Sequence, residues 1–378
     1  MVSERFFRLP EEHLRKIVGE CLTKINVAIV GIGNCASALI QGVNFYKDVS
    51  SEEKIPGLLH VNFGGYHPGD INFVAGFDVD ARKVGKDLSK AIKVKPNNTR
   101  TFSEVPDMGV TVKRGPIMDG LGKYLKPVVK VDKNSVESDV VDVLNKAEAD
   151  MLINYLPVGS EEASKWYAEQ ALKAGCALIN CIPVFIASDD AWQNKFRSAG
   201  LPVAGDDVMS QIGATVLHKT LAKLLVDRGV NIDESYQLNI GGDTDFLNML
   251  EQERLRSKRI SKTSAVRAMI PYDVPLRIGP SDYVDFLDNK KICYIRIKGK
   301  YFGDTPASIE VKLDIWDAPN SGGVIIDAIR AVKLALDRNI AGTLTSISSF
   351  AFKHPPTQLP ASVAKDWVEE FIIGKRER

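Results

Sequence analysis

The sequence predicts an α/β protein built from a doubly wound domain with a parallel sheet and a second, α+β domain. Three observations carry this prediction. Short, continuously apolar runs alternate with amphipathic helical stretches over the first half of the chain, which is typical of a parallel sheet covered on both faces. A glycine-rich turn, GIGNCA, follows the first apolar run. Further on, ICYIRIKGKYF and SIEVKLDIWD alternate with period two, as half-exposed antiparallel strands do.

Length, charge and cysteine content restrict the class of protein. At 378 residues the chain is long enough for two domains. Its 49 basic and 48 acidic residues leave a formal net charge of +1, so we expect no general attraction to nucleic acid or to an anionic membrane. The five cysteines are scattered without a C-x-x-C pair, and no apolar run has the length of a membrane span. We therefore expect a cytoplasmic protein without a targeting segment.

The elements of the first domain can be followed in order. Apolar runs that we expect to form its parallel sheet lie at residues 25–30, 71–77, 151–156, 177–182 and 202–204. The stretch SEEASKWYAEQALKAG, with a serine cap, acids in its first turn and a closing glycine, predicts a covering helix. Two irregular segments, 47–70 and 96–131, interrupt the alternation, and long segments of this kind are often functional. We expect both to cover the cofactor and the site.

The last long amphipathic stretch, GGVIIDAIRAVKLALDRN, follows the two alternating strands. Its apolar residues recur with helical spacing, so we expect a helix that packs back on the first domain. Residues 1–212 and 318–378 are therefore assigned to the doubly wound domain, and residues 213–317 to the α+β domain.

The glycine-rich turn has the features of a dinucleotide site. Gly31 permits a tight turn, Gly33 lets the backbone approach a pyrophosphate, and Ala36 allows the helix to pack closely on the strand. The second apolar run ends at Asp78, where a carboxylate would bind a ribose hydroxyl and repel a 2′-phosphate. NAD is therefore favoured over NADP. The alternative, that an aspartate here only caps the following helix, fits Asp80 better.

Ligands of an open parallel sheet bind beyond the carboxyl ends of its strands. This rule selects Asn154 and Pro157 after the third apolar run, and Asp206 and Asp207 after the fifth. The two aspartates have three alternative roles: they orient a lysine, hold a divalent cation or cap the following helix.

The second domain contains the densest group of charges, in GGDTDFLNMLEQERLRSKRISKTSAV. Asp245 and Asn248 are followed there by Lys258 and Lys262, which are four residues apart and share a helix face. Together with nearby arginines they could bind a phosphorylated substrate. The alternative is an exposed, solvated helix face.

Three further charged residues are isolated candidates, Lys290, Asp317 and Lys353. Lys353 has apolar neighbours, and a lysine in a desolvated pocket has a lowered pKa suited to proton transfer. No pair of histidines has metal-ligand spacing, so no zinc site of the usual kind is expected.

Eight motifs, taken in this order, resemble the myo-inositol-1-phosphate synthase family. They are GIGNCASAL, NYLPVGSEEA, NCIPVFIAS, AGDDVMSQIGAT, LNIGGDTDFLNM, RSKRISKT, DYVDFLDNKK and APNSGGVIIDAIRA. The resemblance runs from about residue 24 to residue 356, and SK-x-ISK downstream of G-G-D-T-D is its most specific part. Where eukaryotic members have N-N-D this chain has G-G-D-T-D, so it resembles the shorter prokaryotic branch.

The resemblance implies an activity, a cofactor and an assembly. The family converts glucose 6-phosphate into inositol 1-phosphate by oxidation at C5, loss of a C6 proton, aldol attack of C6 on the C1 aldehyde and re-reduction at C5, with NAD regenerated in each turnover. The first domain is then a Rossmann domain that binds NAD, and the second is catalytic and forms a homotetramer. A divalent metal ion assists part of the prokaryotic branch, so metal dependence stays open here.

The resemblance also implies site residues. Catalytic positions are Lys258, Lys262, Lys290, Lys353, Asp206, Asp245 and Asp317. Cofactor-binding positions are Gly31, Gly33, Asn34, Cys35, Ala36, Asp78, Asn154, Pro157 and Asp206. Substrate-binding positions are Asn239, Asp245, Asn248, Lys258 and Lys262. We expect Lys258 and Lys353 at O5 and O1, where ammonium groups stabilise negative charge in a dry pocket, and Lys262 and Lys290 on the phosphate or in a proton relay.

Two other functions are compatible with the same residues. The first is an ordinary two-domain NAD-dependent dehydrogenase, which needs one general base and releases NADH. The second is a non-enzymatic NAD-binding regulator whose basic helix contacts a partner. A synthase requires Lys258, Lys290 and Lys353 to converge on one pocket, whereas a regulator would leave them in solvent.

Overall fold

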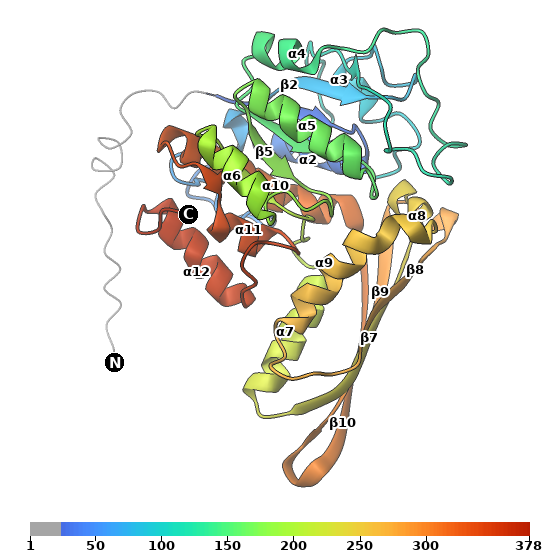
Figure 1. Ribbon diagram of the computed structural model, residues 1–378, viewed down its shortest axis with the longest axis vertical. Coiled ribbons are helices and arrows are strands. Elements are labelled where there is room, and N and C mark those ends of the chain that lie inside the picture. Colours follow the sequence, from blue (N-terminus) through green and yellow to red (C-terminus); the bar gives the residue numbers. More distant parts are fainter. Residues whose placement is uncertain (1–23) are drawn as a thin grey trace.

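The computed structural model describes residues 24–378 (Figure 1). Residues 1–23, which were assigned to the first domain, lie outside the described part. Two lobes, each with its own sheet, make up the fold. None of the helices within residues 24–378 combines the length and the apolar character that crossing a membrane requires.

The first lobe is built on a seven-stranded sheet in the order β11-β6-β5-β4-β1-β2-β3, and every neighbouring pair is parallel. The strands are β1 (Ile25–Val30), β2 (Ile71–Asp78), β3 (Lys113–Arg114), β4 (Met151–Asn154), β5 (Ala177–Asn180), β6 (Pro202–Gly205) and β11 (Gly342–Thr343). All five predicted strands are present. Since β1 lies between β2 and β4, the strand order reverses beside its carboxyl end, where ligands of such sheets bind.

Helices cover both faces of this sheet. They are α2 (Asn34–Tyr46), α3 (Leu88–Ala91), α4 (Val140–Lys146), α5 (Glu161–Lys173), α6 (Asp190–Ser198), α10 (Asp317–Asp337), α11 (Thr345–Ala351) and α12 (Ala361–Ile372), with the 3-10 turn η1 (Pro68–Asp70). Val27 and Ile29 of β1 belong to one apolar core, and Ala28 and Val30 belong to the core on the opposite face. The run is continuously apolar because both of its faces are buried.

The second lobe is a four-stranded sheet in the order β10-β9-β7-β8. Its elements are α7 (Ala214–Asp227), β7 (Asn231–Gly241), α8 (Thr244–Asn248), η2 (Gln252–Leu255), α9 (Arg256–Arg267), β8 (Leu276–Tyr283), η3 (Asp285–Leu287), β9 (Lys290–Tyr301), η4 (Phe302–Asp304) and β10 (Thr305–Trp316). β9 and β10 are antiparallel as predicted, whereas β7 and β8 are parallel. Figure 1 shows this sheet extending away from the first lobe, with α7 and α9 along it.

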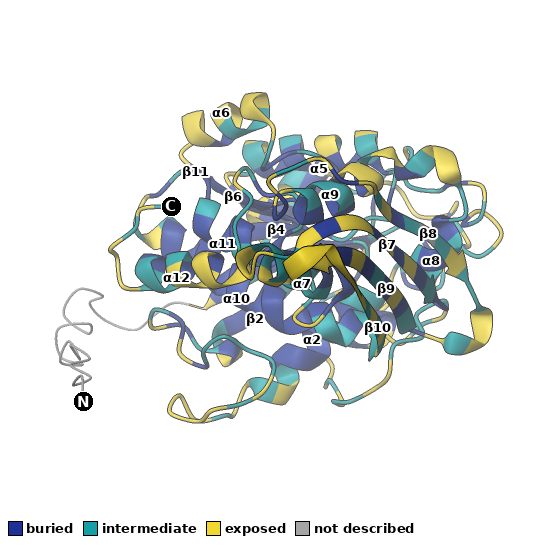
Figure 2. Cartoon of the chain, turned by 90° about the horizontal axis from the view of Figure 1, so that it is seen from below, coloured by how far each residue is buried: buried dark blue, intermediate teal, exposed yellow. Residues whose placement is uncertain are grey.

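The two faces of the second sheet differ in exposure. Cys293, Ile295 and Ile297 of β9 are buried in a core with residues of α7 and α9. Tyr294, which points to the other face, is exposed, and most residues of β10 are exposed or half-buried (Figure 2). The period-two alternation of the sequence therefore reflects one covered face and one open face.

Candidate active site

The turn after β1 leaves room for a ligand at the start of α2. Gly31 has φ of +88°, and a Cβ there would lie 2.5 Å from the carbonyl oxygen of Tyr155, so only glycine fits. A Cβ on Gly33 would meet no atom within 4 Å, which means that this position faces open space. Because the N-cap of α2 is Gly33, no side chain covers the free N–H groups of the first turn. Ala36 is buried and packs the helix onto the core.

Asp78 ends β2 beside this turn. Its carboxylate accepts hydrogen bonds from the backbone N–H groups of Ile32 at 2.9 Å, Val79 at 2.7 Å and Asp80 at 2.9 Å. The buried ammonium of Lys83 lies 3.6 Å from the Asp78 carboxylate and donates to the carbonyl of Ile32. Asp78 is therefore placed where the ribose of a dinucleotide would lie, while Asp80 bonds Arg82 instead.

A cavity of about 870 Å³ lies against the turn, which we call the cofactor cavity. Its lining includes Gly31, Gly33, Asp78, Lys83 and Pro157. The segment 96–131 contributes much of the rest, in agreement with its expected role as a cover. The lining of this and the next cavity, as defined by residues 24–378, contains no residue of segment 47–70.

The segment 47–70 packs on α10 instead, which corrects the expectation that it covers the site. The buried guanidinium of Arg330 donates to the carbonyls of His60 and Val61, and the N–H of Leu59 donates to the carboxylate of Asp327. These contacts hold the segment against α10.

A second cavity, of about 1140 Å³, lies where the two lobes meet and shares Gly33, Leu125 and Pro157 with the first. We call it the charged cavity. Asn34 and Cys35, at the start of α2, also line it. Its charged lining residues are Lys258, Lys262, Lys291, Lys353, Asp207, Asp243, Asp245 and Asp317. They come from both lobes and from segments that are up to 146 residues apart in the chain.

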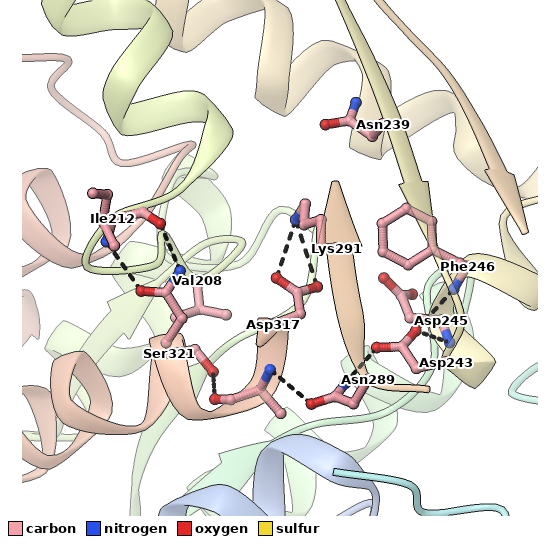
Figure 3. Close-up of polar contacts among 12 residues, drawn as sticks. Val208, Ile212, Asn239, Asp243, Asp245, Phe246, Asn289, Lys291, Asp317 and Ser321 are labelled. Atoms are coloured by element: carbon pink, nitrogen blue, oxygen red, sulfur yellow. Dashed lines mark hydrogen bonds and ion pairs between the residues drawn. The ribbon is translucent and has the colours of Figure 1, made fainter. Parts of the chain in front are cut away.

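Three of the four lysines are paired with an aspartate. The ammonium of Lys258 lies 2.6 Å from the carboxylate of Asp245. Lys291 lies 3.2 Å from Asp317 (Figure 3). The third pair, Lys353 and Asp207, is separated by 2.9 Å.

Lys262 differs from the other three lysines. It is buried and forms no ion pair with a carboxylate in the described part of the chain. Burial, together with the positive charges of Lys258, Lys291 and Lys353, lowers the pKa of Lys262 to about 7. Although burial opposes the charge of Lys258, Asp245 and Asp207 raise the pKa of that lysine. Lys262 is therefore the lysine of this cavity whose surroundings suit proton exchange near neutral pH.

Asp243 is a carboxyl group whose pKa, like that of Lys262, is shifted far from its ordinary value. Its carboxylate accepts from the N–H groups at the start of α8 and from the side chain of Asn289 (Figure 3). Burial and the neighbouring charges of Asp317 and Asp245 raise the pKa of Asp243 to about 7. Asp245, by contrast, has a lowered pKa because Lys258 and Lys262 offset its burial.

The expected role of Asp206 passes to its neighbour. Asp206 is fully buried outside both cavities and accepts from the backbone N–H groups of Ile186, Ala187 and Ser188. Burial raises the pKa of Asp206 to about 6. Asp207 turns the other way, with φ of +62°, and carries the carboxylate that faces Lys353. Residues that follow a strand point to alternate sides, and the sequence did not indicate which aspartate would face the cavity.

Lys290 requires the same correction by one residue. Lys291 lines the charged cavity, whereas the ammonium of Lys290 lies 5.8 Å from the ring of Trp316. The alternation of β9 would have selected Lys291, because the odd-numbered residues Cys293 and Ile295 are the buried ones. A shift of one residue moves a side chain to the opposite face.

Two predicted asparagines lie outside the cavities. Asn154 is buried and donates to the side chain of Asn180, while its own oxygen accepts from the N–H of Leu156. Asn248 is buried and donates to the carbonyl of Val158. Both side chains bond the backbone of the loop after β4, and neither lines either cavity.

Asn239, which is drawn in Figure 3, lines a small recess that adjoins the charged cavity. The recess is also lined by residues 213–216, at the start of α7, and by Lys262, Lys291 and Lys353. The Nδ2 atom of Asn239 is buried and finds no partner among residues 24–378. Free helix N–H groups, an unsatisfied donor and three lysines would favour an anion in this recess.

The carboxylates of the site do not form a metal cage. Within the described chain, no group of three or more histidine, cysteine, aspartate or glutamate side chains is arranged to hold a metal ion. The aspartates of the charged cavity are instead distributed among lysines.

Comparisons with known proteins agree on one family. The family model described as Myo-inositol-1-phosphate synthase matches residues 213–318. The chain is 52% identical over 366 residues to an inositol-3-phosphate synthase of Mycobacterium tuberculosis, covering 96% of this chain and 100% of that protein. An inositol-3-phosphate synthase of Corynebacterium glutamicum is 52% identical over 359 residues, covering 92% and 98%.

Solved structures show the same fold. A myo-inositol-1-phosphate synthase-related protein of Thermotoga maritima has a TM-score of 0.79 and 27% identity, covering 92% of this chain and 98% of that one. Inositol-3-phosphate synthase of Caenorhabditis elegans has a TM-score of 0.69 at 15% identity, covering 93% and 85%, which shows likeness of fold.

Proposed function

The chain belongs to the myo-inositol-1-phosphate synthase family, and on this premise we propose that it is an inositol-3-phosphate synthase. It converts D-glucose 6-phosphate into 1L-myo-inositol 1-phosphate, which is the same compound as 1D-myo-inositol 3-phosphate, without net redox change. The observation that carries this proposal is the charged cavity, where one unpaired lysine lies among three lysine–aspartate pairs beside a dinucleotide site.

NAD is the cofactor that the first cavity fits. The open space at Gly33 and the uncovered start of α2 suit a pyrophosphate, and the Asp78 carboxylate suits a ribose with a free 2′-hydroxyl. Bound NAD supplies an oxidant for C5 of the sugar in the first step and a reductant for the same carbon in the last. Among residues 24–378 no group of three or more histidine, cysteine, aspartate or glutamate side chains is arranged to hold a divalent metal, and no step of the proposal uses one.

The substrate phosphate occupies the recess at the start of α7. The recess offers the N–H groups of residues 213–216, the unsatisfied amide of Asn239 and three lysines, all of which favour an anion. Placing the phosphate there directs the sugar ring into the charged cavity, which shares Lys262, Lys291 and Lys353 with the recess.

The lysines divide the remaining chemistry according to their partners. The ammonium groups of Lys258 and Lys353 lie against the carboxylates of Asp245 and Asp207, and they stabilise negative charge at O5 and O1. Lys262 has a pKa of about 7 and can lose its proton, which suits it to take a proton from C6 and to deliver it to the O1 alkoxide that forms when C6 attacks C1. Lys291, in place of Lys290, holds charge at the phosphate end.

The wider organisation follows the family. Residues 1–212 and 318–378 form the NAD-binding domain, and residues 213–317 form the catalytic and tetramerisation domain. The exposed face of the second sheet, which includes Tyr236, Leu238 and Tyr294, supports a homotetramer assembled through that face. The balanced charge supports a cytoplasmic enzyme without nucleic-acid or membrane partners.

The proposal is tested by incubating the purified protein with NAD and glucose 6-phosphate and following phosphorus NMR together with NADH absorbance. A new inositol phosphate signal without accumulating NADH is the expected result. Net NADH would instead indicate an ordinary dehydrogenase, and no change in either signal would contradict the proposal. A parallel sample with a chelator is expected to behave like the first, because the site has no metal cage.

A further inference from the structure

The part of segment 96–131 that closes the cofactor cavity, residues 116–131, is here called the cofactor cover. Its apolar side chains, including Ile117, Leu121 and Val129, face the cavity, and Leu125 lines both cavities. This stretch contains no regular helix or strand, so its position depends on side chains that fasten it from outside.

The first fastening comes from the cover itself. The carboxylate of Asp119 accepts from the backbone N–H groups of Glu162 at 2.7 Å and Ala163 at 3.0 Å. These are free N–H groups in the first turn of α5, whose own N-cap, Ser160, bonds the carbonyl of Pro157 instead. Asp119 therefore caps α5 from another segment and ties the cover to the first lobe.

The second fastening comes from the other lobe. The carboxylate of Glu251 accepts from the backbone N–H of Lys123 at 2.6 Å. The guanidinium of Arg254 donates to the carbonyls of Gly120 at 3.4 Å and Val158 at 3.2 Å. The cofactor cover is thus held between the second lobe and the loop after β4.

Glycines make room for this second fastening. A Cβ on Gly122 would lie 2.2 Å from the Glu251 carboxylate. A Cβ on Gly159, where φ is +86°, would lie 2.7 Å from the side chain of Arg254. Both glycines are at positions of close approach, which shows that the two charged side chains are built into the cover and are not loosely placed on a surface.

We propose that Asp119, Glu251 and Arg254 are positioning residues that keep the cofactor cover closed on the cofactor through a complete turnover. This inference rests on the proposed function, in which the cofactor that oxidises C5 must still be present to reduce it. If the reduced cofactor left the site, the oxidised sugar would be stranded. Retention of the cofactor therefore decides what fraction of turnovers is completed.

The test measures escape of the reduced cofactor in Asp119→Ala, Glu251→Ala and Gly122→Ala proteins. Turnover with NAD and glucose 6-phosphate is run in the presence of lactate dehydrogenase and pyruvate, which oxidise only NADH that has left the site. We expect lactate formed per inositol phosphate to rise at least about tenfold, since each variant loses or displaces a charge-assisted hydrogen bond of the cover. Glu253→Ala is the matched control, because Glu253 is exposed beside Glu251.

A second measurement does not depend on the synthase reaction. The rate at which NADH leaves each purified protein is followed by its fluorescence after mixing with excess NAD. Release at least about tenfold faster in the variants than in wild type and Glu253→Ala is expected. Unchanged release in all three variants would overturn the inference. Faster release without any inositol phosphate from the wild type would uphold the cover and contradict the proposed function instead.

Discussion

The two cavities that meet at Leu125 and Pro157 are built in different ways. The cofactor cavity is made by a backbone turn, a free helix end and apolar side chains, with Lys83 and Asp78 beside the turn. The charged cavity has four lysines and four aspartates from both lobes. In the proposed function, binding the cofactor relies on backbone shape, whereas the chemistry relies on the lysine that has no carboxylate partner among the described residues.

Removing the unpaired lysine is expected to have the largest effect. Lys262→Met should lower kcat by roughly 10³-fold, because positioned proton transfer contributes about 10² to 10⁴ in rate. NAD affinity should stay unchanged, since Lys262 does not line the cofactor cavity. Steady-state kinetics and NADH fluorescence titration check this, with Arg259→Met on the exposed side of α9 as control. A variant that kept a tenth of the activity would refute the role of Lys262.

Replacing Asp207, the member of the Asp206–Asp207 pair that faces the charged cavity, should cause the next largest loss of kcat. Asp207→Asn should lower kcat by roughly 10²-fold, because Lys353 loses its partner and with it part of its charge stabilisation. Asp206→Asn should act on stability instead, by about 1–3 kcal/mol, because an amide nitrogen would face backbone N–H donors. Kinetics and denaturant unfolding of both variants separate the two roles. Equal effects of the two variants on kcat would contradict the assignment.

The unpaired lysine should also appear in the pH dependence of stability. Its folded pKa of about 7 is lower than its ordinary value, so the unfolded chain binds more protons between about pH 7 and pH 10. The contribution of Lys262 to the free energy of unfolding therefore rises with pH across that window. Relative to Lys262→Met, the wild type should gain about 2 kcal/mol between pH 7 and pH 9, measured by denaturant unfolding. Parallel pH profiles would show that Lys262 keeps an ordinary pKa.

The cofactor cavity should respond more weakly and in a different parameter. Asp78→Ala should weaken NAD binding roughly tenfold, because it removes a carboxylate that would bond a ribose hydroxyl. At saturating NAD, kcat should change less than about twofold, since Asp78 does not line the charged cavity. Fluorescence titration and kinetics at several NAD concentrations measure both quantities. A large fall in kcat with unchanged NAD affinity would contradict the assignment of cofactor binding to the first cavity and of the chemistry to the second.

The sequence predicts the cofactor end better than the charged end, for a physical reason. The turn from Gly31 to Ala36 and the strand that ends at Asp78 are local patterns, and in the proposed function the backbone there binds the cofactor. The charged cavity joins residues that are far apart in the chain, and the facing side chain depends on strand alternation. The predictions therefore missed by one residue at Asp206 and at Lys290, where Asp207 and Lys291 face the cavity.

Other parts of the site left no local signal. The recess at Asn239 is formed by packing α7 against β7 and the lysines, and nothing in the sequence SQIGAT alone predicts which N–H groups remain free. The role of segment 47–70 could not be predicted because its contacts, such as those of Arg330, come from a helix more than 260 residues later. The capping of α5 by Asp119 likewise joins two distant segments.

The central claim is that Lys262, which forms no ion pair with a carboxylate in the described part of the chain, exchanges its proton near neutral pH. Carbon NMR of the lysine side chains, in protein labelled at the carbon next to the ammonium, measures this directly as the pH is raised. We predict one resonance that titrates near pH 7 and is absent from Lys262→Met. If every lysine resonance titrated above pH 9, the division between paired and unpaired lysines would be wrong.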